Sequence, residues 1–187
     1  EGDVVMGLDL MHGGHLTHGS PVNRSGRHHK IVSYRVNEKT ERIDYDEIMA
    51  LALEHKPKMI IAGYTSYPLA PDFRKFRAIA DACGAFLMAD ISHTAGLAAA
   101  GLYPNPIGIA DVTSFTTHKS LIGPRAAVIV TTRADLSDKI DRAVFPGEQG
   151  GPHINAIAGI AVAMKLAQQP VFKRLQQQLV ANAKALA

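Results

Sequence analysis

Phe86-Leu87-Met88-Ala89-Asp90-Ile91-Ser92-His93 is the stretch that decides the fold, because it is an apolar run that closes in polar groups. Residues 86–91 are predicted to form a continuous buried strand. The preceding helical stripe begins after Asp72, repeats apolar residues through Cys83 and ends at Gly84. Continuous apolar strands separated by amphipathic helices predict an α/β fold, with a mostly parallel sheet and helices on both of its faces.

The same alternation extends along the rest of the chain. We expect further strands over residues 4–10, 31–36, 59–64, 112–117 and 126–132. A helix begins at Asp44, which has capping-box spacing to Glu47, and ends at Pro57. Residues 95–100 suggest a short helical turn, and two final helices cover 155–168 and 171–187, split by Pro170. The 117–126 connection is too short for a helical crossover, so this strand pair is a candidate for antiparallel pairing.

Composition excludes several classes of protein. The chain of 187 residues has 20 basic and 17 acidic residues, a balance too even to indicate nucleic acid or an anionic membrane as a partner. The densest basic stretch, residues 24–30, is interpreted as a solvated loop. No apolar run is long enough to span a membrane. The single cysteine, Cys83, rules out an internal disulfide and is typical of a reducing cytosol, so we expect a cytoplasmic location.

Both ends of the chain indicate an internal piece of a longer protein. The sequence begins at Glu1 without methionine and enters an apolar strand almost at once. It stops at Ala187, within a helical pattern.

Polar groups gather where two predicted strands end. Asp90 closes one strand, and Thr116-Thr117-His118-Lys119 closes another. Ligands of parallel α/β sheets bind beyond the carboxyl ends of the strands. A lysine amine there can form a Schiff base with the aldehyde of pyridoxal phosphate (PLP), and an aspartate can keep the pyridine nitrogen protonated. The plainer alternatives are a surface lysine and an aspartate that caps the next helix.

Three histidines occupy the glycine-rich stretch His12-Gly13-Gly14-His15-Leu16-Thr17-His18-Gly19. A metal site is disfavoured, because no cysteine or HExxH pattern accompanies His12, His15 and His18. One imidazole could instead stack on a flat aromatic ring. The alternative, favoured by the loop alone, is a polar turn whose histidines bond to backbone. For His93 the alternatives are contact with a cofactor oxygen or a satisfied histidine beside a helix cap.

A second glycine-rich loop, Gly147-Glu148-Gln149-Gly150-Gly151-Pro152, precedes a predicted helix. Its backbone amides could meet a phosphate. It matches neither a Walker A motif nor a dinucleotide fingerprint, and on its own it is more often a simple turn.

Taken together, these blocks resemble the serine hydroxymethyltransferase family. The resemblance covers nearly the whole chain, through the blocks at residues 9–19, 43–46, 55–58, 89–97, 116–119, 123–125 and 145–152. It implies the central part of the PLP-binding large domain of the aspartate aminotransferase-like fold (fold type I) for residues 1–187. The last helix would lead toward a C-terminal domain that this chain lacks, and an N-terminal segment would also be missing.

The resemblance also implies roles for individual residues. Lys119 would hold PLP, Asp90 would pair with its pyridine nitrogen, His15 would stack on its ring and His93 would approach its phenolic oxygen. His118 would help to set reaction specificity and Thr116 would assist exchange at the lysine. The remaining implied contacts are Thr65 to the cofactor, Gly150 and Gly151 to the PLP phosphate of a partner subunit, and Leu10, Gly14, His15 and Leu16 to folate.

The activity implied is transfer of the serine hydroxymethyl carbon to tetrahydrofolate, giving glycine and 5,10-methylenetetrahydrofolate. A homodimer or tetramer is implied. The isolated piece is expected to be inactive, because the family's residues that bind the substrate lie in the amino-terminal part and the C-terminal domain, outside this chain. The alternatives are another PLP enzyme of this fold, such as a threonine aldolase or a desulfurase, or a homologue that binds without catalysis.

The sequence departs from the family pattern at several positions. Thr65 stands where serine is usual, and Ala126 and Ala127 replace two glycines, which demands a backbone without positive φ. The other departures are at Ser92, Thr94, Ser120 and Ile122.

Overall fold

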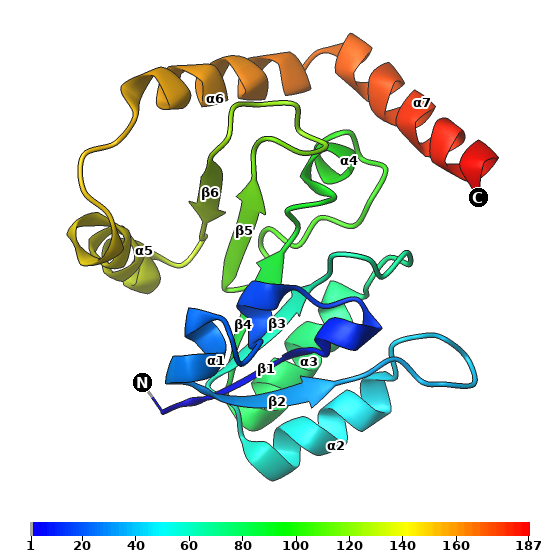
Figure 1. Cartoon of the computed structure of the whole chain (residues 1–187), viewed down its shortest axis with the longest axis vertical. Coiled ribbons are helices and arrows are strands. Elements are labelled where there is room, and N and C mark those ends of the chain that lie inside the picture. Colours follow the sequence, from blue (N-terminus) through cyan, green and yellow to red (C-terminus); the bar gives the residue numbers. More distant parts are fainter. Residues whose placement is uncertain (1) are drawn as a thin grey trace. The chain divides into compact units, whose positions relative to one another are not determined.

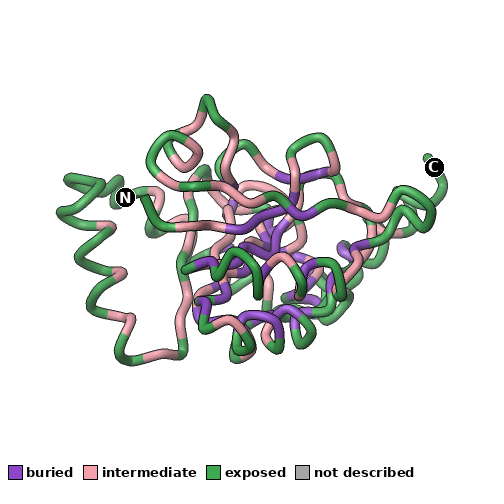
Figure 2. Tube along the Cα trace, turned by 90° about the horizontal axis from the view of Figure 1, so that it is seen from below, coloured by how far each residue is buried: buried purple, intermediate pink, exposed green. Residues whose placement is uncertain are grey.

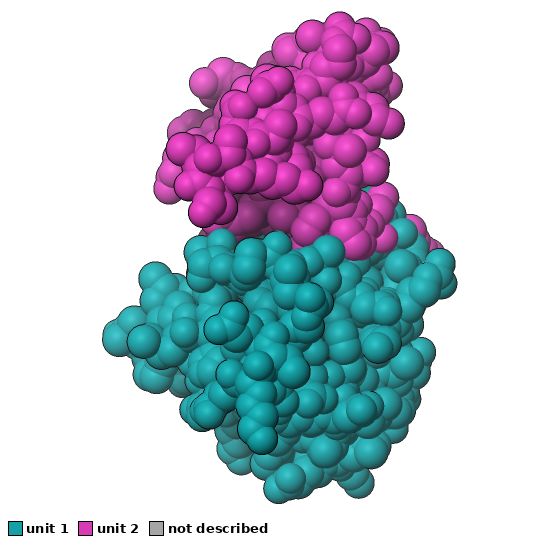
Figure 3. Space-filling model, turned by 90° about the vertical axis from the view of Figure 1, so that its right-hand side faces the viewer, with its two compact units in different colours: residues 1–90, 106–113 teal, residues 91–105, 114–187 magenta. Residues whose placement is uncertain are grey.

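The computed structural model describes residues 2–187. The chain divides into two compact units, residues 1–90 with 106–113 and residues 91–105 with 114–187 (Figure 3). The strands follow the order β2-β1-β3-β4-β5-β6 (Figure 1). Their bounds are β1 Val4–Leu8, β2 Lys30–Tyr34, β3 Met59–Gly63, β4 Phe86–Asp90, β5 Val112–Thr116 and β6 Ala127–Val130.

The first unit contains a parallel array. β1 pairs with β2 and β3, and β3 pairs with β4, all in parallel. The register sets Gly63 opposite Asp90 at the carboxyl ends of β3 and β4. This parallel arrangement with intervening helices confirms the predicted α/β class.

Two helices of the first unit begin and end where the sequence predicts. α2 (Tyr45–His55) and α3 (Phe73–Cys83) are capped by Asp44 and Asp72, whose carboxylates each accept two backbone N–H groups of the first turn. α3 ends at Gly84 in the left-handed conformation (φ 74°), and its buried stripe lies against β3 and β4. Buried positions gather on the strands and on the inner faces of these helices (Figure 2).

Helices dominate the second unit. It contains α4 (Ala95–Ala99), α5 (Ala134–Arg142), the distorted turn η3 (Ala143–Glu148), α6 (Ile154–Ala167) and α7 (Pro170–Leu186). Its small core comprises Ala100, Leu121 and Phe172, against which Phe115, Met164 and Ala167 pack. Pro170 is the first residue of α7, where its missing N–H costs nothing, so it opens the helix rather than lying between two helices.

Local differences from the sequence predictions have identifiable causes. The basic stretch after Asn23 is not a loop, because the Asn23 side chain accepts from Ser25 N–H and starts the short helix α1 (Arg24–His28). The turns η1 (Leu10–His12) and η2 (Leu16–His18) and helix α5 were not predicted. α5 buries no residue, and its N-cap residue Arg133 makes no capping hydrogen bond with its side chain, so the usual N-terminal signal is absent.

One predicted backbone feature can be compared directly with the structure. Ala126 and Ala127 are not among the described residues with positive φ, as their replacement of glycines demands. Ile122 has a φ of 62°, an unusual value for a β-branched residue. None of the helices in the described part of the chain is both long and apolar enough to cross a membrane.

Candidate functional site

The loop after β1 is folded by its glycines. Gly13 and Gly19 have φ values of 103° and 128°, which disfavour other residues. A Cβ on Gly14 would collide with the carbonyl oxygen of Leu8. The carbonyl oxygen of Gly13 accepts from Thr65 N–H at 2.8 Å, so this loop lies beside the segment that follows β3.

His18 in this loop binds Asp90 at the end of β4. The two atoms, His18 Nε2 and Asp90 Oδ2, are 2.9 Å apart, and His18 is only 5% exposed. An ionised carboxylate only accepts, so Nε2 carries the hydrogen and donates it. His18 Nδ1 is buried and has no hydrogen-bond partner among the described residues. Asp90 is therefore a paired, partly buried carboxylate, and it does not cap α4, whose N-cap residue is Thr94.

Two glycines make room for this pair. A Cβ on Gly63 would lie 2.6 Å from the Asp90 Cβ and 2.5 Å from the Asp90 carbonyl oxygen. A Cβ on Gly7 would lie 3.0 Å from the His18 carbonyl oxygen. The close approach of β3 to β4, and of β1 to the loop that carries His18, thus depends on the absence of side chains at these two positions.

His15 is bonded within its own turn. Its Nδ1 lies 2.7 Å from Thr17 Oγ1 and accepts from Thr17 N–H at 3.2 Å. Its ring centre is 5.5 Å from that of His18, with the planes tilted by 57°. The hydrogen bonds of Nδ1 agree with the interpretation of this loop as a polar turn. Stacking of the ring on a cofactor remains a prediction.

In the second unit, Lys119 and His93 come together. Lys119 Nζ is 3.2 Å from His93 Nε2. An ammonium only donates, so a protonated Lys119 donates to Nε2. Ser120 Oγ donates to the His93 carbonyl oxygen at 2.7 Å, which ties together the two loops that carry these side chains.

Neighbouring contacts fix the end of β5. Thr116 N–H donates to Ser92 Oγ at 3.2 Å, and Thr116 Oγ1 donates to the Ser92 carbonyl oxygen at 3.3 Å. The Thr117 hydroxyl donates to the Pro124 carbonyl oxygen at 2.6 Å and closes the following turn. His118 Nδ1 is buried and has no partner among residues 2–187. The serine at position 92, a departure from the family pattern, thus anchors Thr116.

The remaining predicted contacts are more open. Leu10 and Leu16 are both exposed, beside the buried Gly14. Gly150 and Gly151 are exposed, and a Cβ on either would meet nothing within 4 Å. Packing within this chain does not explain why these two positions are glycine, and their contact with a phosphate remains a prediction.

The predicted residues therefore form two groups, each within one unit. The first unit holds Leu10, Gly14, His15, Leu16, Thr65 and Asp90, and the second holds His93, Thr116, His118, Lys119, Gly150 and Gly151. The second unit holds a primary amine beside an imidazole and the first holds a paired carboxylate, and each of these groups is one that PLP chemistry uses. No group of three metal-ligating side chains occurs among residues 2–187.

Sequence reasoning missed the role of His18, which it weighed as a metal ligand, as a ring-stacking imidazole or as a histidine bonded to backbone. Its partner Asp90 is 72 positions away. The sequence did contain a signal for this pair: His18 lies in the loop after one predicted strand, and Asp90 ends another. Loops and residues at the carboxyl ends of parallel strands meet at the same edge of a sheet.

Comparison with known proteins agrees with these motifs. A sequence model of the serine hydroxymethyltransferase family matches residues 1–187. The chain is 57% identical over 186 residues to a serine hydroxymethyltransferase of Synechococcus sp. (strain JA-3-3Ab), and covers 43% of that protein. It is 56% identical to the enzyme of that name from Rippkaea orientalis and 54% to that from Nostoc punctiforme, and covers 44% of each.

All of this chain aligns with each of these relatives, although it spans less than half of their length. The match runs through both units and through every block that carries the candidate site residues. The chain therefore belongs to the serine hydroxymethyltransferase family.

Proposed function

We propose that the full-length protein that contains this chain uses PLP to convert serine and tetrahydrofolate into glycine, 5,10-methylenetetrahydrofolate and water, and the reverse. The observation that carries the proposal is the Lys119–His93 contact of 3.2 Å directly after β5. The carboxylate of Asp90, held by His18 after the neighbouring strand β4, supports it. The family membership of the chain points to the same reaction.

Lys119 is the residue that would hold the cofactor. When bound, PLP would supply an aldehyde for this amine and a ring that withdraws electrons from the substrate Cα. Lys119 Nζ lies 3.2 Å from His93 Nε2, so the imidazole holds the amine in place after β5. The contact between the two side chains thus orients Lys119 for attachment.

Asp90 is the residue that would keep the pyridine nitrogen protonated. One of its oxygens, Oδ2, accepts from His18, which fixes the plane of the carboxylate. His18 acts through Asp90 and is a positioning residue.

The other roles follow the family. His15 would stack on the ring, His118 would shape reaction specificity, and Thr65 and Thr116 would supply hydroxyl groups near the cofactor and Lys119. Leu10, Gly14, His15 and Leu16 would line the folate site. Gly150 and Gly151 would serve the PLP phosphate of a partner subunit in a cytoplasmic homodimer or tetramer. We expect the 187-residue piece alone to be inactive, as the central part of the large domain.

Borohydride trapping tests the attachment directly. The full-length protein is loaded with PLP, reduced with borohydride, digested and mapped by mass spectrometry. We expect a pyridoxyl adduct on Lys119 and none on Lys139, an exposed lysine of α5. An unmodified Lys119 would overturn the proposal and favour a homologue that binds without catalysis.

A second assay separates this reaction from that of a threonine aldolase. Exchange of the glycine α-proton with solvent is followed by NMR, with and without tetrahydrofolate. Exchange that speeds up with folate supports the proposed reaction, and folate-independent exchange with threonine cleavage favours the aldolase.

A further inference from the structure

Gln176 of α7 is a buried amide that donates a hydrogen bond to the residue after Lys119. Its exposure is 0%, and Nε2 donates to the Ser120 carbonyl oxygen at 2.8 Å. Oε1 is buried and has no partner among the described residues. Burying an amide whose oxygen has no hydrogen-bond partner costs free energy of folding. The presence of Gln176 at this position therefore needs an explanation, and its hydrogen bond to Ser120 offers one.

Ser120 is the centre of a small network around Lys119. Its carbonyl oxygen accepts from Gln176, and its hydroxyl donates to the His93 carbonyl oxygen. The same hydroxyl accepts from Gly96 N–H at 3.0 Å. One residue thus joins α7, the start of α4 and the loop of His93 to the backbone beside Lys119.

Gly96 lets these segments approach one another. A Cβ at this position would collide with the Ser120 carbonyl oxygen and would lie 3.0 Å from Gln176 Nε2. No side chain fits between α4 and the Ser120 backbone, so the network is closed on that side.

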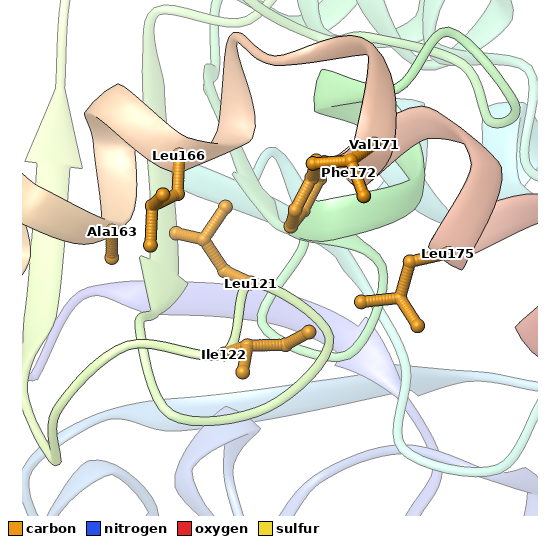
Figure 4. Close-up of a pocket in the computed structure, with 7 residues that line it drawn as sticks. All are labelled: Leu121, Ile122, Ala163, Leu166, Val171, Phe172 and Leu175. Carbon is orange, nitrogen blue, oxygen red and sulfur yellow. The ribbon is translucent and has the colours of Figure 1, made fainter.

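Apolar packing presses α7 onto the same loop. Phe172 lies one turn before Gln176 and therefore on the same face of α7. It packs in the core with Leu121, the residue after Ser120. Beside it, Leu121 and Ile122 line a small apolar pocket of about 190 Å³ with residues of α6 and α7 (Figure 4). The loop that follows Lys119 is held by polar contacts at Ser120 and by apolar contacts at Leu121.

We propose that Gln176 and Ser120 are positioning residues that hold Lys119 against His93. The catalytic meaning of this inference rests on the proposed function, since it concerns the same lysine. Gln176 fixes the backbone carbonyl one residue after Lys119, and Ser120 fixes the backbone of His93. With both restrained, Lys119 Nζ stays within 3.2 Å of His93 Nε2. Without them, the pair separates and Lys119 becomes an ordinary mobile lysine.

The test measures the amine itself in the full-length protein without cofactor. Trace acetylation by acetic anhydride over a range of pH is quantified by mass spectrometry for each lysine, and Lys139 is the exposed internal reference. The altering variants are Gln176→Met, which keeps the length of the side chain, and Ser120→Ala. The controls are Gln177→Met, an exposed neighbour on α7, and Ser120→Thr, which keeps the hydroxyl.

In the wild-type protein, we expect the Lys119 acetylation rate to differ from that of Lys139. In Gln176→Met and Ser120→Ala it moves roughly five-fold toward the Lys139 rate, the effect of losing about one hydrogen bond. Gln177→Met and Ser120→Thr keep the wild-type rate and pH profile. Urea unfolding of each variant reports any general loss of stability.

Two results would overturn the inference. One is a Lys119 rate equal to that of Lys139 in the wild-type protein. The other is an unchanged Lys119 rate in Gln176→Met while its stability falls, which would make Gln176 a structural residue only. Because this readout needs no PLP, failure of borohydride trapping at Lys119 would refute the proposed function and leave the positioning inference intact.

Discussion

Gly63→Ala tests how closely β3 and β4 must approach to hold Asp90. The new Cβ would lie 2.6 Å from the Asp90 Cβ, whereas ordinary contact begins at 3.4 Å. β4 must therefore move by about 0.8 Å at Asp90, because a strand backbone cannot rotate away as a flexible side chain can. If that shift falls along the hydrogen bond, the distance from His18 Nε2 to Asp90 Oδ2 grows from 2.9 Å to well beyond bonding range.

The expected cost has two parts. Overpacking at Gly63 lowers the free energy of unfolding by about 1–3 kcal/mol. Loss of the held carboxylate weakens PLP binding by roughly ten-fold, the size of one charge-assisted hydrogen bond. Urea unfolding measures the first in the full-length protein, and a fluorescence titration with PLP measures the second.

Gly159→Ala is the matched control. It adds the same methyl group to α6, where the nearest atom is the Pro124 Cγ at 3.1 Å and where alanine favours the helix. We expect little change in stability or PLP binding. If Gly63→Ala unfolds and binds PLP like the wild-type protein, the strand end adapts freely and the glycine requirement is refuted.

Three further predictions test other contacts by substitution. His18→Leu leaves the Asp90 carboxylate without its imidazole partner and should weaken PLP binding by roughly ten-fold, as measured by the same titration; unchanged affinity would remove His18 from the site. Asp111→Ala removes the acceptor of Leu87 N–H and Arg77 and should cost about 1–3 kcal/mol in urea unfolding, whereas Asp135→Ala, in an exposed pair with Arg133, should change nothing measurable. Tyr34→Phe loses the hydrogen bond to the Ile61 carbonyl oxygen and should cost about 1 kcal/mol at neutral pH. Burial raises the pKa of Tyr34 and that of Tyr45, so the wild-type fold keeps its full stability below about pH 10 and loses stability as pH rises above it. Tyr34→Phe should show a shallower alkaline decline in melting temperature, and equal declines would contradict the assignment.

Local signals in the sequence predicted most of the secondary structure. Asp44 and Asp72 were identified as caps because short acidic side chains before an apolar stripe satisfy the first backbone N–H groups. The strands were found as apolar runs, although several begin or end a residue or more inside the predicted bounds. These features depend on neighbours within a few residues, so a single sequence contains them.

The site could be predicted only in part, because its side chains are brought together by tertiary contacts. The strand-end positions of Asp90 and Lys119 follow from where two apolar runs end, which is visible in the sequence. The pairing of His18 with Asp90 depends on the register of β1, β3 and β4, which no local pattern specifies. The bond from Gln176 to Ser120 spans 56 positions and needs the packing of Phe172 on Leu121. The departures at Ser92 and Ser120 acquired a meaning only through those contacts.

The division of the chain into units has a consequence for inheritance. The backbone passes from one unit to the other after residues 90, 105 and 113. The segment 106–113 returns to the first unit with Asp111, which satisfies Leu87 N–H and Arg77 there. A crossover in the gene between the codons of Asp90 and Asp111 would therefore join β4 of one parent to the Asp111 carboxylate of the other. A crossover between the codons of Asp111 and Lys119 would join Asp90 of one parent to the Lys119 loop of the other. We therefore expect the two groups of site residues to be inherited together from one parent gene.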